Sequence, residues 1–135
     1  MRWSTCAAPP RRCERGAAVV DFVLVVVVLV PLLLGILQLG LVLHVRNTLT
    51  AAASAGARFA ATVDGTPAAG AIRTRQMIDG ALAARFADRV SAASTRVAGV
   101  AGVVVRVEAD VPPLGLWGPP VHIAVDGHAV KERLP

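Results

Sequence analysis

Residues 22–43 of the chain read FVLVVVVLVPLLLGILQLGLVL, without a single charged side chain. At about 1.5 Å of rise per residue, a helix of this length crosses a hydrocarbon core of about 30 Å. The apolar residues surround the whole helix instead of forming one stripe, which disfavours burial in the small core of a 135-residue chain. The segment therefore predicts a transmembrane helix.

The flanks of this segment predict its orientation. Four arginines precede it, whereas only Arg46 and Arg58 follow it within about 20 residues, so the positive-inside bias places the N-terminus in the cytoplasm. A cleaved secretory signal has an apolar region of about 7–15 residues, so this longer segment is expected to remain in the mature protein. We expect a single-pass protein of the cell membrane with a basic cytoplasmic leader (1–16), a transmembrane helix (17–45) and a small extracytoplasmic α+β domain (46–135).

Composition excludes several classes of function. The net charge of +5 comes largely from the leader, and no basic surface interleaved with aromatic residues follows, so nucleic acid is not an expected partner. Both cysteines, Cys6 and Cys13, lie in the leader on the predicted cytoplasmic side, which disfavours a structural disulfide.

Changes of periodicity predict the elements that follow the membrane segment. The first helix is expected to continue outward through the alanine-rich stretch 47–61 and to end near Asp64-Gly65, a turn pair. Thr66 is a candidate N-cap with Pro67 at the first helical position, which predicts a second, amphipathic helix over 67–91. Its apolar positions recur every fourth residue, at Ile78, Leu82, Phe86 and Val90.

A period of two then replaces the helical period. Apolar residues alternate with polar ones from Val103 to Val111, Pro112-Pro113 interrupts the pattern, and a second alternating stretch runs from Val121 to Val130. We therefore predict a small antiparallel pair of strands packed on the helices, which makes the fold class α+β.

The first half of the chain also carries a family resemblance. Residues 15–22, RGAAVVDF, resemble the processing site of type IV pilin-like proteins: a basic leader ends in glycine, an acidic residue follows at mature position five, and an apolar helix begins. Residues 31–58, with Pro31, Gly35 and Gln38, then HVRNTL from His44 and a stretch ending at Arg58, are similar to the TadE family of tight-adherence pilus biogenesis proteins. The loop at 113–118 and the ending VDGHAV at 125–130 extend this similarity more faintly.

This resemblance implies a pilin-like fold and a subunit cut by a prepilin peptidase between Gly16 and Ala17. It also implies that Asp21 neutralises the amino terminus of a neighbouring subunit and so sets the register of adjacent helices; a carboxylate in the bilayer is costly without such a partner. The chain departs from the family at two positions: Asp21 stands where glutamate is usual, and Ala55 replaces a glutamate that commonly precedes Gly56. From the residues alone, Asp21 also fits a carboxylate favoured near a helix start or a residue at the membrane interface.

Two further features are candidate contact sites. Ala52, Gly56 and Ala60 are spaced by four and predict a smooth ridge that lets helix backbones approach closely, as in assembly with other subunits. Trp117, between glycine and prolines in an apolar loop, is a candidate partner surface or a cap on the domain's own core.

Catalytic and cofactor motifs are not expected in this chain. The sequence has no Gly-x-Ser-x-Gly elbow, phosphate-binding loop, His-Glu-x-x-His motif or paired-cysteine metal motif, and His122 and His128 are too far apart on a straight strand to share a metal. We therefore predict a non-enzymatic, cofactor-free minor pilin or pseudopilin whose partners are the membrane, pilin-like subunits and the pilus assembly machinery. Two other readings stay open: an uncleaved single-span protein that presents a binding domain outside the cell, and a domain released by cleavage near Ala51-Ala52-Ala53.

Overall fold

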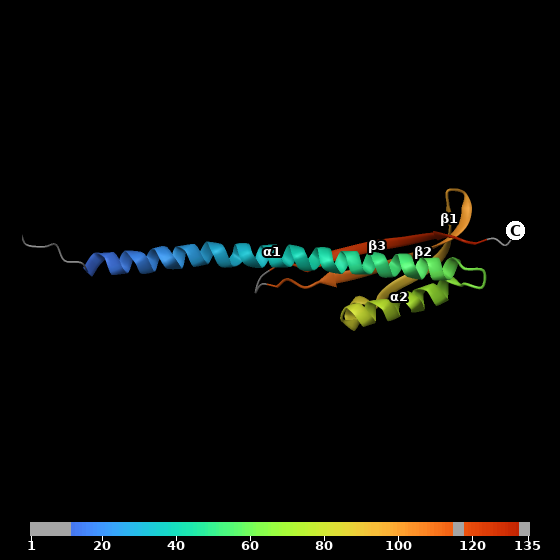
Figure 1. Cartoon of the computed structure of the whole chain (residues 1–135), viewed down its shortest axis with the longest axis horizontal. Coiled ribbons are helices and arrows are strands. Elements are labelled where there is room, and N and C mark those ends of the chain that lie inside the picture. The colour runs from blue at the N-terminus through green and yellow to red at the C-terminus, as the bar shows by residue number, and fades with distance from the viewer. Residues whose placement is uncertain (1–11, 115–117, 133–135) are drawn as a thin grey trace, which may run out of the picture. The chain divides into compact units, whose positions relative to one another are not determined.

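The computed structural model describes residues 12–114 and 118–132 of the chain (Figure 1). The chain divides into two compact units, one that ends at Ile36 and one that begins at Leu37. Its elements are α1 (Arg12–Ala61), α2 (Pro67–Ala81), a short 3-10 helix η1 (Ala84–Phe86) and the strands β1 (Arg89–Val97), β2 (Val100–Val111) and β3 (Val121–Val130). The first unit consists of α1 up to Ile36, and the second, which we call the head, contains all the other elements.

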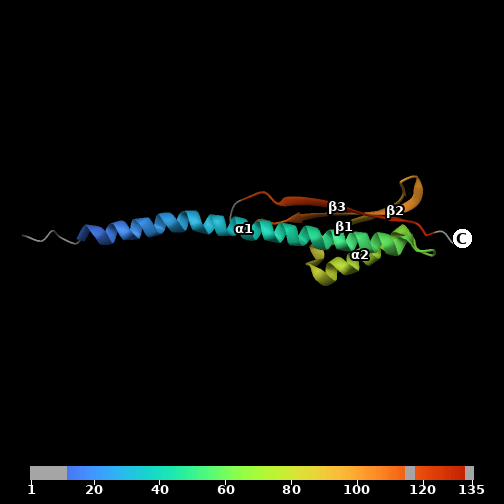
Figure 2. The ribbon, with the colours of Figure 1, turned by 45° about the horizontal axis from the view of Figure 1, so that its top comes forward.

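The head is a two-layer structure. Its three strands form an antiparallel sheet in the order β1-β2-β3, and the C-terminal part of α1 runs antiparallel to α2 along the sheet (Figures 1 and 2). The last turn of α1 is tied to the end of the chain, because the Ala61 carbonyl accepts a hydrogen bond from Glu132 N–H at 2.9 Å. This bond satisfies one of the carbonyl groups that a helix end leaves without an intrahelical partner.

The start of α2 follows the sequence signals, whereas its end does not. The Thr66 side chain accepts a hydrogen bond from Ala69 N–H at 3.2 Å, and Pro67 stands at the start of the helix, as predicted. The helix stops at Ala81 instead of continuing to Ser91, and the chain passes through η1 into β1. The predicted helix was therefore too long, and β1 is a strand that the sequence patterns did not predict.

Strand β2 is the centre of the sheet and explains the regular alternation in its sequence. Buried positions alternate with half-buried or exposed ones from Val103 to Val111, as expected for a sheet with one covered face. A two-residue turn joins β1 to β2, in which Ala98 and Gly99 both have positive φ, 51° and 81°. Both values fit the hairpin turn whose twist matches that of the strands.

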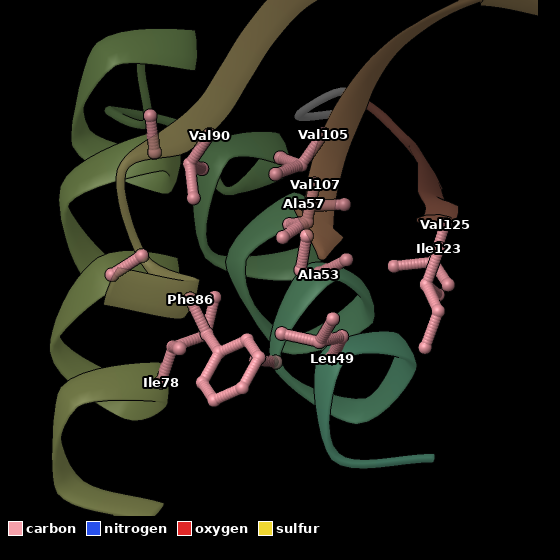
Figure 3. Close-up of a cluster of buried hydrophobic side chains, with 14 of the residues drawn as sticks. Leu49, Ala53, Ala57, Ile78, Phe86, Val90, Val105, Val107, Ile123 and Val125 are labelled. Atoms are coloured by element: carbon pink, nitrogen blue, oxygen red, sulfur yellow. The ribbon is translucent and has the colours of Figure 1, made fainter. Parts of the chain in front are cut away.

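The core lies between the covered face of the sheet and the two helices (Figure 3). Leu49, Ala53 and Ala57 of α1 face valines of β2 and the residues Ile123 and Val125 of β3 (Figure 3). A second group of core residues comes from α2, η1 and β1, which contribute Ile78, Phe86 and Val90 respectively. The structure confirms the predicted α+β class with a long apolar N-terminal helix and a second helix, and the sheet has three strands instead of the expected pair.

Candidate functional site

The N-terminal part of α1 is an uninterrupted apolar helix surface. It belongs to the one helix among the described residues that is long and apolar enough to cross a membrane, and none of its most apolar 18-residue window is buried. Large side chains are exposed around the helix, from Phe22 at 68% to Leu33 at 54%. A surface of this kind is stable in lipid or against other apolar helices, but costly in water.

The predicted processing residues lie at the start of this surface. Gly16 and Ala17 are both within α1, which begins at Arg12, and Asp21 is exposed on the same helix. Because residues four apart share one helix face, the Ala17 and Asp21 side chains are neighbours on that face.

The predicted ridge of small residues is buried inside the head. Ala52 is 1% exposed, Ala60 is 0% exposed, and Gly56 is buried between them. A Cβ placed at Gly56 would lie 1.9 Å from Thr74 Oγ1 and 2.7 Å from Gly70 O of α2. The ridge therefore allows close helix packing within the chain, and a contact between this ridge and another subunit stays a prediction.

A second close approach joins α1 to the sheet. A Cβ placed at Gly127 of β3 would lie 2.4 Å from both Ala53 C and Ala53 O. The backbone of β3 thus touches the backbone of α1, and no larger residue fits without a shift of one element. The same stretch of α1 thus makes two close backbone contacts, with α2 at Gly56 and with β3 at Ala53.

Gln38 forms a contact that sequence reasoning missed. Its Nε2 donates a hydrogen bond to Pro112 O at 3.3 Å, and its Oε1 accepts one from Leu114 N–H at 2.7 Å. One side-chain amide thus holds both ends of the short segment 112–114, which directly follows β2. The signal was present in the sequence, because Gln38 is the only polar side chain between residues 22 and 43.

The uncovered face of the sheet carries ion pairs across the strands. Arg106 donates from Nε to Asp126 Oδ1 at 2.7 Å and from Nη2 to Asp126 Oδ2 at 2.9 Å. Asp110 is paired with Arg89 through Oδ2, and its Oδ1 lies 2.7 Å from His122 Nδ1. All of these groups are substantially exposed, so each pair adds little to stability.

These pairs shift the pKa values of three groups. The hydrogen bond with His122, followed by that with Arg89, lowers the pKa of Asp110 below its ordinary value of 3.8. The hydrogen bond from Arg106 lowers the pKa of Asp126, and the same bond raises the pKa of Arg106. Carboxylates held ionised in this way act as charged surface groups and not as proton donors near neutral pH.

The remaining predicted residues assemble no further site in the part of the chain that the structure describes. Within residues 12–114 and 118–132, no three His, Cys, Asp or Glu side chains come together as metal ligands would. Trp117, the candidate partner surface, lies outside the described residues.

The structure combines an apolar helix that is long enough to cross a membrane with a small α+β head, and these are the features of the class of single-pass membrane proteins. The model of the family described as TadE-like protein matches residues 16–58, which confirms the predicted resemblance. The match covers 43 of the 135 residues and lies within α1. Comparison with curated proteins and with solved structures finds no match.

Proposed function

We propose that the chain is a structural minor pilin or pseudopilin of the tight-adherence pilus system. The observation that carries the proposal is the position of the family match: residues 16–58 coincide with α1 almost to its end at Ala61. This region contains both the exposed apolar surface and the stretch covered by the sheet and α2. A subunit built in this way contacts lipid or neighbouring helices through one part of α1 and carries its own head on the other part.

In this proposal, the leader 1–16 is cytoplasmic, α1 crosses the membrane, and the head is extracytoplasmic. Cleavage between Gly16 and Ala17 by a prepilin peptidase creates a new helix start with a free amine at Ala17. Asp21 then lies one turn inside that start, where the helix macrodipole favours a negative charge. The amine of a neighbouring subunit is a second partner for this carboxylate, and such a pair sets the axial register between two helices.

The alternative function is an uncleaved single-span protein that presents its head as a binding domain outside the cell. One observation favours it. The Gly16–Ala17 bond lies within α1, which begins four residues before Gly16, whereas proteolytic cleavage concentrates at exposed, irregular segments.

The N-terminal residue and intact mass of the membrane-extracted chain, from cells with and without their prepilin peptidase, test the two functions. The proposal expects a start at Ala17 that depends on the peptidase. An intact leader in both strains contradicts processing and favours the alternative.

The role of Asp21 is tested separately with Asp21→Asn and Asp21→Glu. Both variants keep a hydrogen-bonding side chain at this position, but only Asp21→Glu keeps the charge. We expect Asp21→Asn to lose co-purification with the other pilin-like subunits and Asp21→Glu to retain it. Equal co-purification of the two variants would contradict a charge pair in assembly.

A further inference from the structure

The hydrogen bonds of Gln38 bring a loop of the head onto the apolar helix. Both bonds are made to backbone groups, Pro112 O and Leu114 N–H, and Gln38 itself is half-buried. The head therefore reaches further toward the N-terminus of α1 than the start of its core at Val45, which is 1% exposed.

The length of the helix places this contact at the edge of the hydrocarbon. Measured from Phe22, where charged residues end, about 30 Å of helix at 1.5 Å per residue reaches about residue 41. Gln38 comes about 4.5 Å before that point. A side-chain amide at this depth is costly unless it is hydrogen-bonded, and the loop satisfies both its donor and its acceptor.

The loop is also chemically suited to an apolar environment. Of its described residues 112–114 and 118–120, four are prolines, which have no N–H group, and the N–H of Leu114 is bonded to Gln38. Irregular backbone is tolerated at membrane depth only where its polar groups have partners. The sequence between Asp110 and His122 contains no charged residue.

Exposed leucines surround this contact. Leu37, Leu39 and Leu43 of α1 are 52%, 60% and 49% exposed, and Leu114 of the loop is 48% exposed. Further along α1, Arg46 lines a shallow groove together with His122 of β3. Arg46 is eight residues beyond Gln38, about 12 Å along the axis, so a cationic side chain follows the apolar ones in the order in which headgroups follow acyl chains.

We propose that the segment Pro112–Leu114 is a membrane-interface contact, with the Leu114 side chain inserted at the boundary between acyl chains and headgroups. Gln38 is the positioning residue that holds the segment at this depth. The head is thus seated on the lipid surface at two places, at α1 and at this loop. The inference rests on the membrane insertion in the proposed function, but not on cleavage or on a role in a pilus.

The test uses the full chain with Cys6→Ser and Cys13→Ser and one new cysteine that carries an environment-sensitive fluorophore. Leu114→Cys is the test position, and Val100→Cys is the matched control, because Val100 is a 39% exposed apolar residue at the opposite end of β2. The end of β2 near the loop is about 36 Å away from Val100 at 3.3 Å per residue. Leu29→Cys, in the apolar segment, reports insertion of α1 itself. Each protein is reconstituted into phosphatidylcholine–phosphatidylglycerol vesicles with and without brominated acyl chains.

We expect brominated lipid to quench the label at Leu114 at least about two-fold more than the label at Val100, since interfacial apolar groups are buried about 5–10 Å into the boundary between headgroups and acyl chains. Equal quenching at Leu114 and Val100, with strong quenching at Leu29, overturns the inference and leaves membrane insertion intact. A blue-shifted Leu114 label that brominated lipid does not quench also overturns it, because the residue is then covered by protein, such as a second copy of the chain. Absence of quenching at all three positions overturns both the inference and membrane insertion.

Gln38→Leu tests the positioning role. The substitution keeps α1 apolar but leaves Pro112 O and Leu114 N–H without their partner. We expect quenching at Leu114 to fall by about half as the loop leaves the helix for water, where these groups are hydrated, while quenching at Leu29 stays unchanged. Unchanged quenching at Leu114 contradicts a positioning role for Gln38.

Discussion

The two parts of α1 differ in side-chain size and in what covers them. From Phe22 to Ile36 the helix carries mostly valine and leucine, and large side chains remain exposed on every face. From Ala51 to Ala61 it carries mostly alanine, and the residues that face the sheet and α2 are buried. One continuous helix thus meets two environments, and the size of its side chains changes with the environment.

The physical reason lies in how closely each part is approached. Large side chains provide apolar area to lipid or to other helices, and they need no fixed partner in the chain. The alanine-rich part contacts the backbone of α2 at Gly56 and the backbone of β3 at Gly127. At both glycines even a methyl group does not fit. Close packing in the head therefore depends on small side chains. Insertion of α1 into a membrane would depend on large apolar ones.

Gly127→Val is expected to have the largest effect, because it breaks the contact on the sheet side of α1. The new Cβ would meet the Ala53 backbone at 2.4 Å, and a helix backbone cannot move aside as a side chain can. We expect a loss of about 3 kcal/mol or more in unfolding free energy, measured by thermal denaturation of the full chain in detergent. The control Ala124→Val, at an exposed position on the same strand, should change stability by less than about 0.5 kcal/mol.

Leu32→Arg places a charge in the exposed apolar part of α1. An arginine near the bilayer centre costs about 2.5–3.5 kcal/mol on insertion scales, so we expect less chain in the membrane fraction. The control is Phe59→Arg, which changes a residue of the same helix with similar exposure, 50% against 58% for Leu32. Membrane retention should survive Phe59→Arg, and equal losses in both variants would contradict the distinction between the two parts of α1.

Gly56→Ala tests the close contact between α1 and α2. The added methyl group meets Thr74 Oγ1 at 1.9 Å and Gly70 O at 2.7 Å, so the two helices must separate. We expect a loss of about 1–2 kcal/mol in the same denaturation measurement, after the gain in helix propensity is included. Gly80→Ala in α2, where a Cβ meets nothing within 4 Å, should instead stabilise the chain by about 0.5–1 kcal/mol. A gain of the same size at Gly56 would show that the backbones are not in contact.

The smallest expected effect concerns the uncovered face of the sheet, which packing does not hold. Because the pKa of Asp110 is lowered in the folded chain, its ionised form stabilises the fold above the ordinary pKa of 3.8, and this contribution is lost as the pH falls through the lowered value. Asp110→Asn should therefore slightly lower the melting temperature at pH 6, with the difference from the unmodified chain vanishing in strong acid.

After the end of α2 at Ala81, the four-residue apolar period no longer predicts the secondary structure. Ile78, Leu82, Phe86 and Val90 recur every fourth residue, as in one helix, and in the structure all four do face the core. They do so from a helix, a cap, a 3-10 turn and a strand. Strand β1 is rich in serine and alanine, which have weak strand propensity, so its pairing with β2 and not its own residues determines its conformation.

The sequence by itself determined the apolar helix, the N-cap at Thr66, strands β2 and β3 and the resemblance that the family match confirms, because each depends on local periodicity or on a short motif. Only the tertiary structure decided that the ridge at Gly56 packs within the chain, that Gly127 touches Ala53, and that Gln38 holds the loop after β2. Each of these contacts joins residues distant in the sequence, from 14 positions for Gly56 and Gly70 to 76 for Gln38 and Leu114. Local patterns predict which residues are buried or hydrogen-bonded. Which residue each of them contacts depends on the tertiary structure.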